Sequence, residues 1–262
     1  MSIEILKENK LKDLKGIYLF GSTGSNNYLR SALMLEEKKL DWKQVQVNLL
    51  KYENFKPEYL KINPQGSIPA MIHDGLAIYG SENILKYIEK AFPNPTLTPE
   101  DESDMWEWVQ SATRTHIETA IGILYKNKSG RPIRKDMIGK YKKHNPNKLN
   151  FIEKRGYHMT KAQEKEVLDI NHAKLRMLDD QLKQSSYIMG DEISVADFAW
   201  APDIVFLSTL GFDVSPYKNI ERWLNDISQR DSWNKRTKLP KAGLKIGGYY
   251  LKMLSKSSKY MD

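Results

Sequence analysis

The sequence predicts a chain in two parts, a mixed α/β region at the start and an almost wholly helical region after it. Three observations support this prediction. Residues 1–91 alternate between short strand-like runs and helical patterns, as α/β domains do. Residues 92–99 (FPNPTLTP) contain three prolines in eight positions, which interrupts any helix. Residues 100–240 carry apolar side chains mainly at helical spacing.

The first region opens with a predicted strand, a helix and a second strand. Residues 17–20 form a short apolar run that ends at a glycine, which is typical of a buried strand followed by a turn. Residues 21–27 are turn-forming and helix-capping types, and residues 29–36 then place apolar groups at helical spacing. Residues 42–49 alternate between polar and apolar types, which predicts a half-buried strand.

A hairpin and a helix complete the first region. The apolar runs 68–72 and 76–78 are separated by residues 73–75 (His-Asp-Gly), a pattern typical of a β-hairpin. Ser81 comes next and is expected to cap a helix that carries apolar groups on its inner face.

The second region contains several predicted helices. Apolar residues at helical spacing indicate them around residues 106–112, 167–182 and 222–227. Another is expected to begin at Ser194 with a reciprocal cap. There the Ser194 hydroxyl would accept from the amide of Asp197, and the Asp197 carboxylate would accept from the Ser194 amide.

These patterns give a division of the chain. We expect one domain over residues 1–91, a linker at 92–99, and a helical domain over 100–240 with a long insert near 126–160. Residues 241–262 form a basic C-terminal extension. The lysines of the insert and the extension are interpreted as a solvated surface, because aromatic residues do not alternate with them as in single-strand nucleic-acid binding. No nucleic-acid partner is expected.

Composition narrows the function classes. The 262 residues carry a formal net charge of +8 and contain no cysteine, so any thiol chemistry must use a thiol supplied by a ligand. The five histidines lack the spacing of a metal site, and no metal is expected. No apolar run is long enough to span a bilayer, and the N-terminus lacks the unbroken apolar stretch of a signal peptide. We therefore expect a cytoplasmic protein with no membrane partner.

Four segments in order resemble the glutathione transferase family. Residues 63–70 (NPQGSIPA) are similar to its asparagine-proline-x-glycine-x-valine-proline segment, and Ser81 with Ile84 to its serine-x-x-isoleucine helix start. Residues 190–197 resemble its internal capping motif, and residues 223–230 its tryptophan-to-arginine stretch. The resemblance implies an N-terminal thioredoxin-like domain, βαβ then ββα, followed by a C-terminal helical bundle.

The resemblance also implies glutathione as co-substrate. Its cysteine residue would pair with the backbone of Ile68 before a cis Pro69, like a one-residue strand addition. The γ-glutamyl carboxylate would lie at the helix start, near Ser81. The family usually places an acidic residue just before this serine, whereas this chain has Gly80 there and Glu82 after it. The further glutathione-binding residues expected from the resemblance are Asn26, Asn54 and Ser67.

The thiol of glutathione must ionise before it can attack. A free thiol has a pKa of about 8.5, and a hydroxyl, a side-chain amide or a helix N-terminus can lower it. The turn at residues 21–27 offers such groups, and the resemblance places the activating residue there. Ser25 and Asn27 are the first candidates and Thr23 the next, while Tyr18 is interpreted as a core residue.

A second substrate would bind between the two domains. The candidate pocket residues are Trp108, Ser111, Tyr125 and Tyr157. For Trp108 the alternative interpretation, packing between helices, is preferred. At the glycyl end of glutathione, Phe55 occupies a position where several branches of the family carry histidine or glutamine, which weakens that contact.

The sequence leaves several functions open. Loop and insert residues resemble bacterial β-etherases, which predicts thiolate attack on a small hydrophobic electrophile such as an aryl ether. The alternatives are a glutathione-dependent isomerase of the maleylacetoacetate type and a non-catalytic binding module on the same fold. A detoxification role and a homodimer are expected by resemblance.

Overall fold

The computed structural model describes residues 1–8, 10–115, 133–155, 160–209 and 211–237. The chain divides into two compact units. The first unit comprises Met1–Thr98 and Pro132–Lys154, and the second comprises Pro99–Arg131 and Arg155–Asp262. Among the described residues, no helix is both long and apolar enough to cross a membrane.

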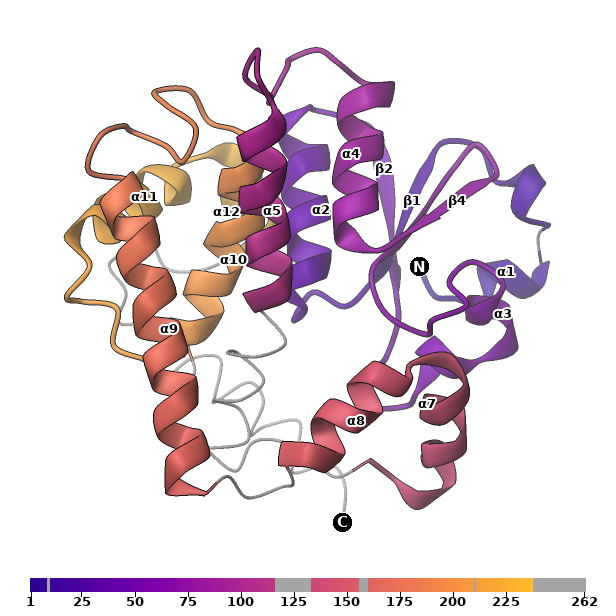
Figure 1. Ribbon diagram of the computed structural model, residues 1–262. Helices are drawn as coiled ribbons and strands as arrows, with labels where there is room; N and C mark the ends of the chain where they lie inside the picture. Colours follow the sequence, from indigo (N-terminus) through magenta and orange to yellow (C-terminus); the bar gives the residue numbers. More distant parts are fainter. Residues whose placement is uncertain (9, 116–132, 156–159, 210, 238–262) are drawn as a thin grey trace. The chain divides into compact units, whose positions relative to one another are not determined.

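The first unit is built on a four-stranded sheet (Figure 1). Its strands are β1 (Ile17–Gly21), β2 (Trp42–Gln46), β3 (Ala70–His73) and β4 (Leu76–Tyr79), in the order β2-β1-β3-β4. β1 and β2 run parallel, whereas β1–β3 and β3–β4 are antiparallel. The predicted fold class is therefore confirmed. One detail was wrong, because the hairpin's first strand begins at Ala70 instead of Ile68, whose next residue is a proline without an N–H.

Helices surround this sheet. The helices α2 (Asn26–Glu37) and α4 (Ser81–Ala91) pack against each other, as Figure 1 shows. The short elements are α1 (Ile5–Glu8), η1 (Leu11–Asp13), η2 (Glu53–Phe55) and α3 (Pro57–Leu60). Tyr18 is 6% exposed and belongs to the hydrophobic core with Phe20 and Val45, so its interpretation as a core residue is confirmed.

A buried lysine holds residues 92–97, near the end of the segment Met1–Thr98, in place. The Lys38 side chain is fully buried, and its ammonium donates to the carbonyls of Phe92 and Pro95 at 2.7 Å each. It also pairs with Glu89 at 2.8 Å. The carboxylate of Glu89 in turn accepts from the amide of Leu97 at 2.9 Å. These bonds hold residues 92–97 against α2 and α4 without any regular secondary structure.

The segment 132–154 belongs to the first unit by its contacts, although the predicted division assigns it to the helical domain. It contains η4 (Lys135–Met137), α7 (Ile138–His144) and the start of α8 (Pro146–Arg155). The physical reason is a small apolar cluster in which Met137, Tyr141 and Leu149 pack against Phe55.

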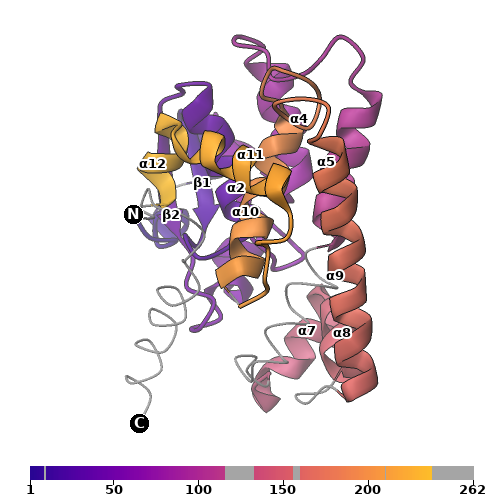
Figure 2. The same cartoon turned by 90° about the vertical axis from the view of Figure 1, so that its left-hand side faces the viewer.

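The described part of the second unit is helical. Its elements are α5 (Ser103–Thr115), α9 (Lys161–Gln181), α10 (Val195–Thr209), α11 (Lys218–Ser228) and α12 (Asp231–Thr237). α10 packs against α5, and α11 packs against the long α9 (Figure 2). α10 is buried almost throughout, which explains why most of its side chains are apolar.

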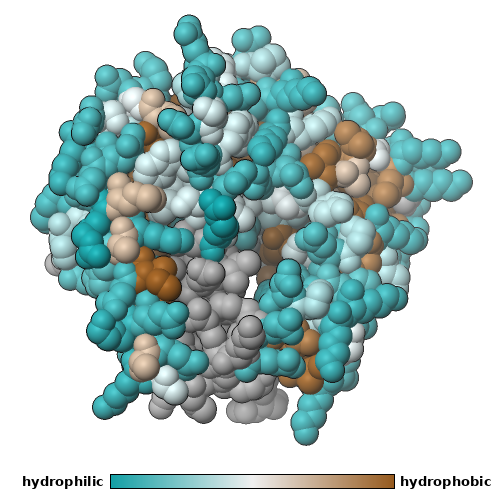
Figure 3. Space-filling view, in the orientation of Figure 1, coloured by the Kyte–Doolittle hydropathy of each residue, from teal (hydrophilic) through white to brown (hydrophobic). Residues whose placement is uncertain are grey.

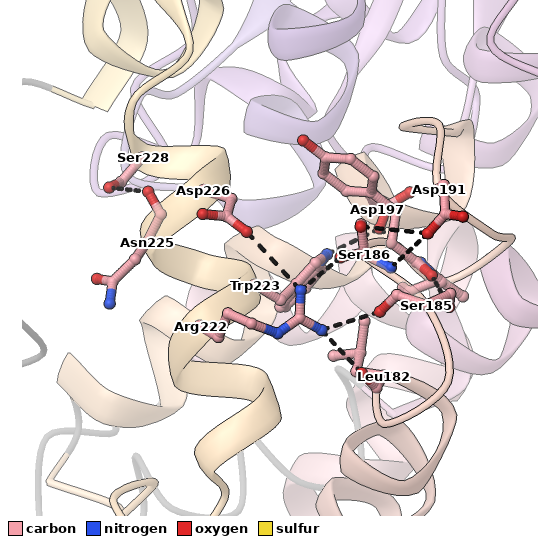
Figure 4. A network of polar contacts seen from close by, with 12 residues as sticks. Leu182, Ser185, Ser186, Asp191, Asp197, Arg222, Trp223, Asn225, Asp226 and Ser228 are labelled. Atoms are coloured by element: carbon pink, nitrogen blue, oxygen red, sulfur yellow. Dashed lines mark hydrogen bonds and ion pairs between the residues drawn. The ribbon is translucent and has the colours of Figure 1, made fainter.

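A buried carboxylate organises the start of α10 (Figure 4). Asp197 Oδ1 accepts from the Ile188 amide at 3.0 Å and from the Trp223 indole at 2.8 Å. Asp197 Oδ2 accepts from the Ser194 amide and from the Ser194 hydroxyl, each at 2.8 Å. Burial raises the pKa of Asp197, and these four donors act in the opposite direction. The predicted cap is correct for the carboxylate but wrong for the hydroxyl, which donates to Asp197 Oδ2.

Replacement Asp197→Ala is expected to lower the free energy of unfolding by about 3 to 5 kcal/mol, because four buried donors lose their acceptor. Urea denaturation measures the loss. Asp226→Ala is the matched control, since Asp226 is half exposed and only 3.8 Å from Arg222, and it should change stability by less than about 0.5 kcal/mol. Equal effects of the two variants would contradict the assigned role of Asp197.

Candidate functional site

The segment Gly66–Pro69 is held by side chains from the preceding loop. The carbonyl of Ser67 accepts from the Tyr59 hydroxyl and from the Asn63 side-chain amide, each at 2.6 Å. Asn54 Nδ2 donates to the Gly66 carbonyl at 2.7 Å. Burial raises the pKa of Tyr59, so its hydroxyl keeps its proton and remains a donor at neutral pH. These three side chains fix two successive carbonyls directly before Ile68.

Ile68 itself has unused backbone groups. The Ile68–Pro69 peptide bond is cis, and the residue lies just outside the sheet. Within the described part of the chain, neither the amide nor the carbonyl of Ile68 takes part in a hydrogen bond. Its side chain packs on the sheet's core cluster, which anchors the residue while the polar backbone stays unpaired. An extended peptide can therefore pair with this residue.

The start of α4 lies directly beside this segment. The Gly80 amide donates to the Pro69 carbonyl at 3.2 Å, and Ser81 is the first residue of the helix and 5% exposed. The expectation that Ser81 caps α4 was wrong by one residue, because Gly80 occupies the N-cap with φ 83° and ψ 131°. That backbone conformation favours glycine over the acidic residue expected there. Glu82 pairs with Lys86 at 2.8 Å one turn further along α4.

The start of α2 brings further candidates together. Ser25 is the N-cap, and its hydroxyl oxygen accepts from the Tyr28 amide at a long 3.4 Å. Its O–H hydrogen is then available for donation to a ligand. Asn26 is buried, and the buried Asn27 Oδ1 has no hydrogen-bond partner among the described residues. Thr23 lies in the exposed turn before the helix.

Asn54 and Phe55 form the loop wall opposite Gly66. Phe55 is buried, and a Cβ at Gly66 would stand only 2.6 Å from the Phe55 ring, so only glycine fits this approach. The Phe55 ring meets Tyr141 edge-on, with centroids 4.7 Å apart. Phe55 therefore serves packing and supplies no polar side chain to the site, as its apolar character suggested.

The candidate pocket residues for a second substrate are only partly described. Trp108 and Ser111 are half-buried residues of α5. The Trp108 carbonyl accepts from the Trp200 indole at 3.0 Å, and the two rings meet edge-on at 5.8 Å. This agrees with helix–helix packing for Trp108. Tyr125 and Tyr157 lie outside the described residues.

The polar backbone groups that the first unit leaves unpaired suit an anionic peptide. In the described ranges, no group of three or more histidine, aspartate or glutamate residues is placed to hold a metal ion. Instead the first unit offers an unpaired backbone at Ile68 and two helix N-termini, those of α2 and α4. Helix N-termini stabilise carboxylates and thiolates through unpaired amides and the helix dipole.

Comparison with known families decides the classification. The glutathione S-transferase N-terminal domain matches residues 19–96, and the glutathione S-transferase C-terminal domain matches residues 137–231. Together they span more than half of the chain. The chain belongs to the glutathione S-transferase family. The predicted family is thereby confirmed, and this family uses glutathione as a co-substrate.

Individual relatives of this chain are distant. Glutathione S-transferase hmp2 of Hypomyces subiculosus is 27% identical over 223 residues, covering 84% of this chain and 97% of that protein. Glutathione S-transferase GstB of Escherichia coli K12 is 25% identical over 229 residues, covering 86% and 99%. Among solved structures, the β-etherase LigF of Sphingobium sp. strain SYK-6 has a TM-score of 0.74 at 21% identity, covering 85% and 98%. That likeness shows the shared fold.

Sequence reasoning missed the residues that hold the segment Gly66–Pro69. Tyr59 carries no sequence signal, because its role depends on a bond to Ser67 eight residues away. Asn63 was noticed only as part of the family-like segment 63–70, although it is fully buried and bonds to both Ser67 oxygens. The signal that could have found Asn63 is an Asn-Pro turn directly before a strand, where an amide can bind the following backbone.

Replacing both donors to the Ser67 carbonyl should lower the free energy of unfolding by more than the sum of the two single replacements. Tyr59→Phe is expected to cost about 1 kcal/mol of unfolding free energy and Asn63→Ala about 2 kcal/mol, since one donor remains in each case. The double variant should exceed their sum by at least about 0.5 kcal/mol, because the carbonyl is then unpaired. Ser67→Ala, which removes only a 3.1 Å contact with Asn63, is the control in the same denaturation series. Simple additivity would show that the two donors act independently.

Proposed function

We propose that this chain is a glutathione-dependent transferase whose glutathione site lies wholly within the first unit. The site comprises the Ile68 backbone, the N-terminus of α4 at Ser81, and the N-terminus of α2 at Ser25. The observation that carries the proposal is the unpaired amide and carbonyl of Ile68, positioned by the bonds to Ser67 and Gly66. Family membership supplies glutathione as the peptide.

Each end of glutathione has a chemical counterpart in this proposal. The cysteine residue pairs with Ile68 as a one-residue antiparallel strand. The γ-glutamyl carboxylate accepts from the free amides at the start of α4 and from the Ser81 hydroxyl. With Gly80 in place of an acidic residue, the ammonium has no carboxylate at the usual position. Glu82, half-buried and one residue further along, is the nearest replacement in sequence.

Ser25 is the proposed thiol-activating residue. Its oxygen already accepts from the Tyr28 amide, so its own hydrogen can point to the thiolate. Each pKa unit of thiol lowering corresponds to about 1.4 kcal/mol of preferential thiolate stabilisation. One hydroxyl donor together with the N-terminus of α2 supplies stabilisation of this size. Asn27 and Thr23 are the alternative donors, on the same turn.

The proposed reaction is substitution at an electrophilic carbon. The thiolate forms a carbon–sulfur bond, the bond to the leaving group breaks, and the leaving group takes up a proton. For an aryl ether the leaving group is an aryloxide, the finer proposal that the resemblance to β-etherases suggests. Assays with a β-aryl ether, an activated aryl halide and maleylacetone separate etherase, general transferase and isomerase activities. Glutathione binding without any turnover would favour a non-catalytic module, and no binding at millimolar glutathione in calorimetry would refute the proposal.

Ser25→Ala is expected to lower kcat by about 100-fold while the glutathione Kd stays within about three-fold, because the hydroxyl acts on the thiolate more than on the bound peptide. The pH dependence of thiolate absorbance in the binary complex should shift to higher pH. Ser25→Thr, which keeps both the cap and the donor, is expected to retain most activity. Ser22→Ala in the same turn is the matched control, and an equal loss there would remove the special role of Ser25.

Pairing of two copies in a homodimer and a cytoplasmic, detoxifying role remain proposals from the family. Sedimentation analysis should give about twice the chain's mass of 30.4 kDa. A species that stays monomeric at micromolar concentration would contradict the expected dimer and leave the glutathione site unaffected.

A further inference from the structure

The segment 132–154 packs against the loop that forms one wall of the glutathione site. Phe55 of η2 is the centre of the contact, with Tyr141 edge-on at 4.7 Å and the His144 ring centroid at 6.2 Å. Met137 and Leu149 complete the buried cluster, and Tyr52 and Leu60 pack against it. The same Phe55 ring covers Gly66, two residues before Ile68. α7 is therefore attached to the loop that positions the peptide-binding backbone.

Polar contacts fasten this segment on both sides of the cluster. His144 Nδ1 lies 2.8 Å from the Pro64 carbonyl, and the Arg134 amide donates to the Tyr52 hydroxyl at 3.3 Å. The Arg134 guanidinium also lies 5.4 Å from the centre of the Tyr52 ring. These contacts join residues about eighty positions apart and set the register of α7 along the loop.

Lys140 is the cation that this register brings to the loop. Its ammonium lies 3.5 Å from the Phe55 carbonyl, a long contact that leaves most of its donor capacity unused. Among the described residues no carboxylate lies within ion-pair distance of Lys140. The nearby Asp136 is already paired with Arg134. Figure 3 shows mainly hydrophilic side chains over α7, as expected for a helix that carries several lysines, and a hydrophobic patch beside them over α8.

The direction of the bound peptide follows from the flanking bonds. The start of α4 lies on the Pro69 side of Ile68, because the Gly80 amide bonds to the Pro69 carbonyl. Asn54 lies on the opposite side, because it bonds to the Gly66 carbonyl. A peptide with its γ-glutamyl end at α4 must extend its other end toward Asn54 and Phe55. That loop side offers a neutral amide and a buried ring, so the peptide's terminal carboxylate needs a cation from elsewhere.

We propose that Lys140 of α7 binds the glycyl carboxylate of glutathione and makes the site selective for a peptide with a free carboxyl terminus. The proposal rests on the proposed function, since it takes glutathione at Ile68 as given. Lys51, an exposed residue at the start of the same loop, is the competing cation. Lys56 is engaged with Glu4 and Glu53 at 3.5 Å each.

The test compares glutathione with its glycyl ethyl ester, which lacks the negative charge at that end. By calorimetry, the wild-type protein should bind glutathione about five-fold more tightly than the ester. Lys140→Ala and Lys140→Gln should weaken glutathione binding by a similar factor, leave ester binding unchanged and so abolish the discrimination. Lys140→Arg should retain it, and the difference should shrink at high salt. Lys142→Ala, on another face of the same helix, is the matched control.

The outcomes separate the two proposals. If the wild-type protein binds neither ligand, the glutathione site itself is refuted. If the wild-type protein binds glutathione and Lys140→Ala discriminates against the ester as before, the role of Lys140 is overturned while the glutathione site stands. Loss of discrimination in Lys51→Ala, with Lys140→Ala unaffected, would assign the carboxylate to Lys51 instead. A melting temperature within about 2 °C of wild type confirms that exposed Lys140 was removed without unfolding α7.

Discussion

The carbonyl of Ser67 is the fixed point on which the candidate site depends. It receives two short hydrogen bonds, from Tyr59 and Asn63, and both donors are buried. A carbonyl held by two donors cannot rotate without losing both, so the next residue, Ile68, has a defined direction. One residue earlier, the side-chain amide of Asn54 holds the Gly66 carbonyl in the same way. The unpaired groups of Ile68 are thus positioned by side chains of η2, α3 and the turn that follows them.

The candidate site includes two helix N-termini, and they differ in how they are made. α2 begins with a serine N-cap whose oxygen bonds inside the helix, whereas α4 begins after a glycine with positive φ and no side-chain cap. A helix start without an internal cap leaves more unpaired amides for an external acceptor. Gly80 therefore removes an acidic side chain from the site but keeps the backbone route for a carboxylate. This departure weakens the ammonium end of the proposed ligand more than its carboxylate end.

Local patterns in the sequence predicted what local forces determine. The strand at 17–20, the hairpin around residues 73–75 and the helix that starts after the capping turn at 21–27 all depend on neighbouring residues, and all appear in the structure. The cap of α4 lies one residue before the predicted Ser81, and the Ser194 hydroxyl donates where it was expected to accept, since a cap's geometry depends on backbone angles that residue types do not fix. Long-range bonds were beyond prediction: the ammonium of Lys38 reaches carbonyls more than fifty positions away.

The position of segment 132–154 also depends on long-range contacts that the sequence did not predict, and these contacts affect the candidate site. Most of it falls within the match to the C-terminal family domain, which begins at residue 137, yet its contacts place it in the first unit. A buried phenylalanine explains this, because the aromatic ring of Phe55 buries its apolar surface against Met137, Tyr141 and Leu149. A polar residue at position 55 could face a ligand directly but could not hold α7. Because position 55 carries an apolar ring in place of a polar side chain, one wall of the candidate site depends on packing against α7, a helix from a distant part of the chain.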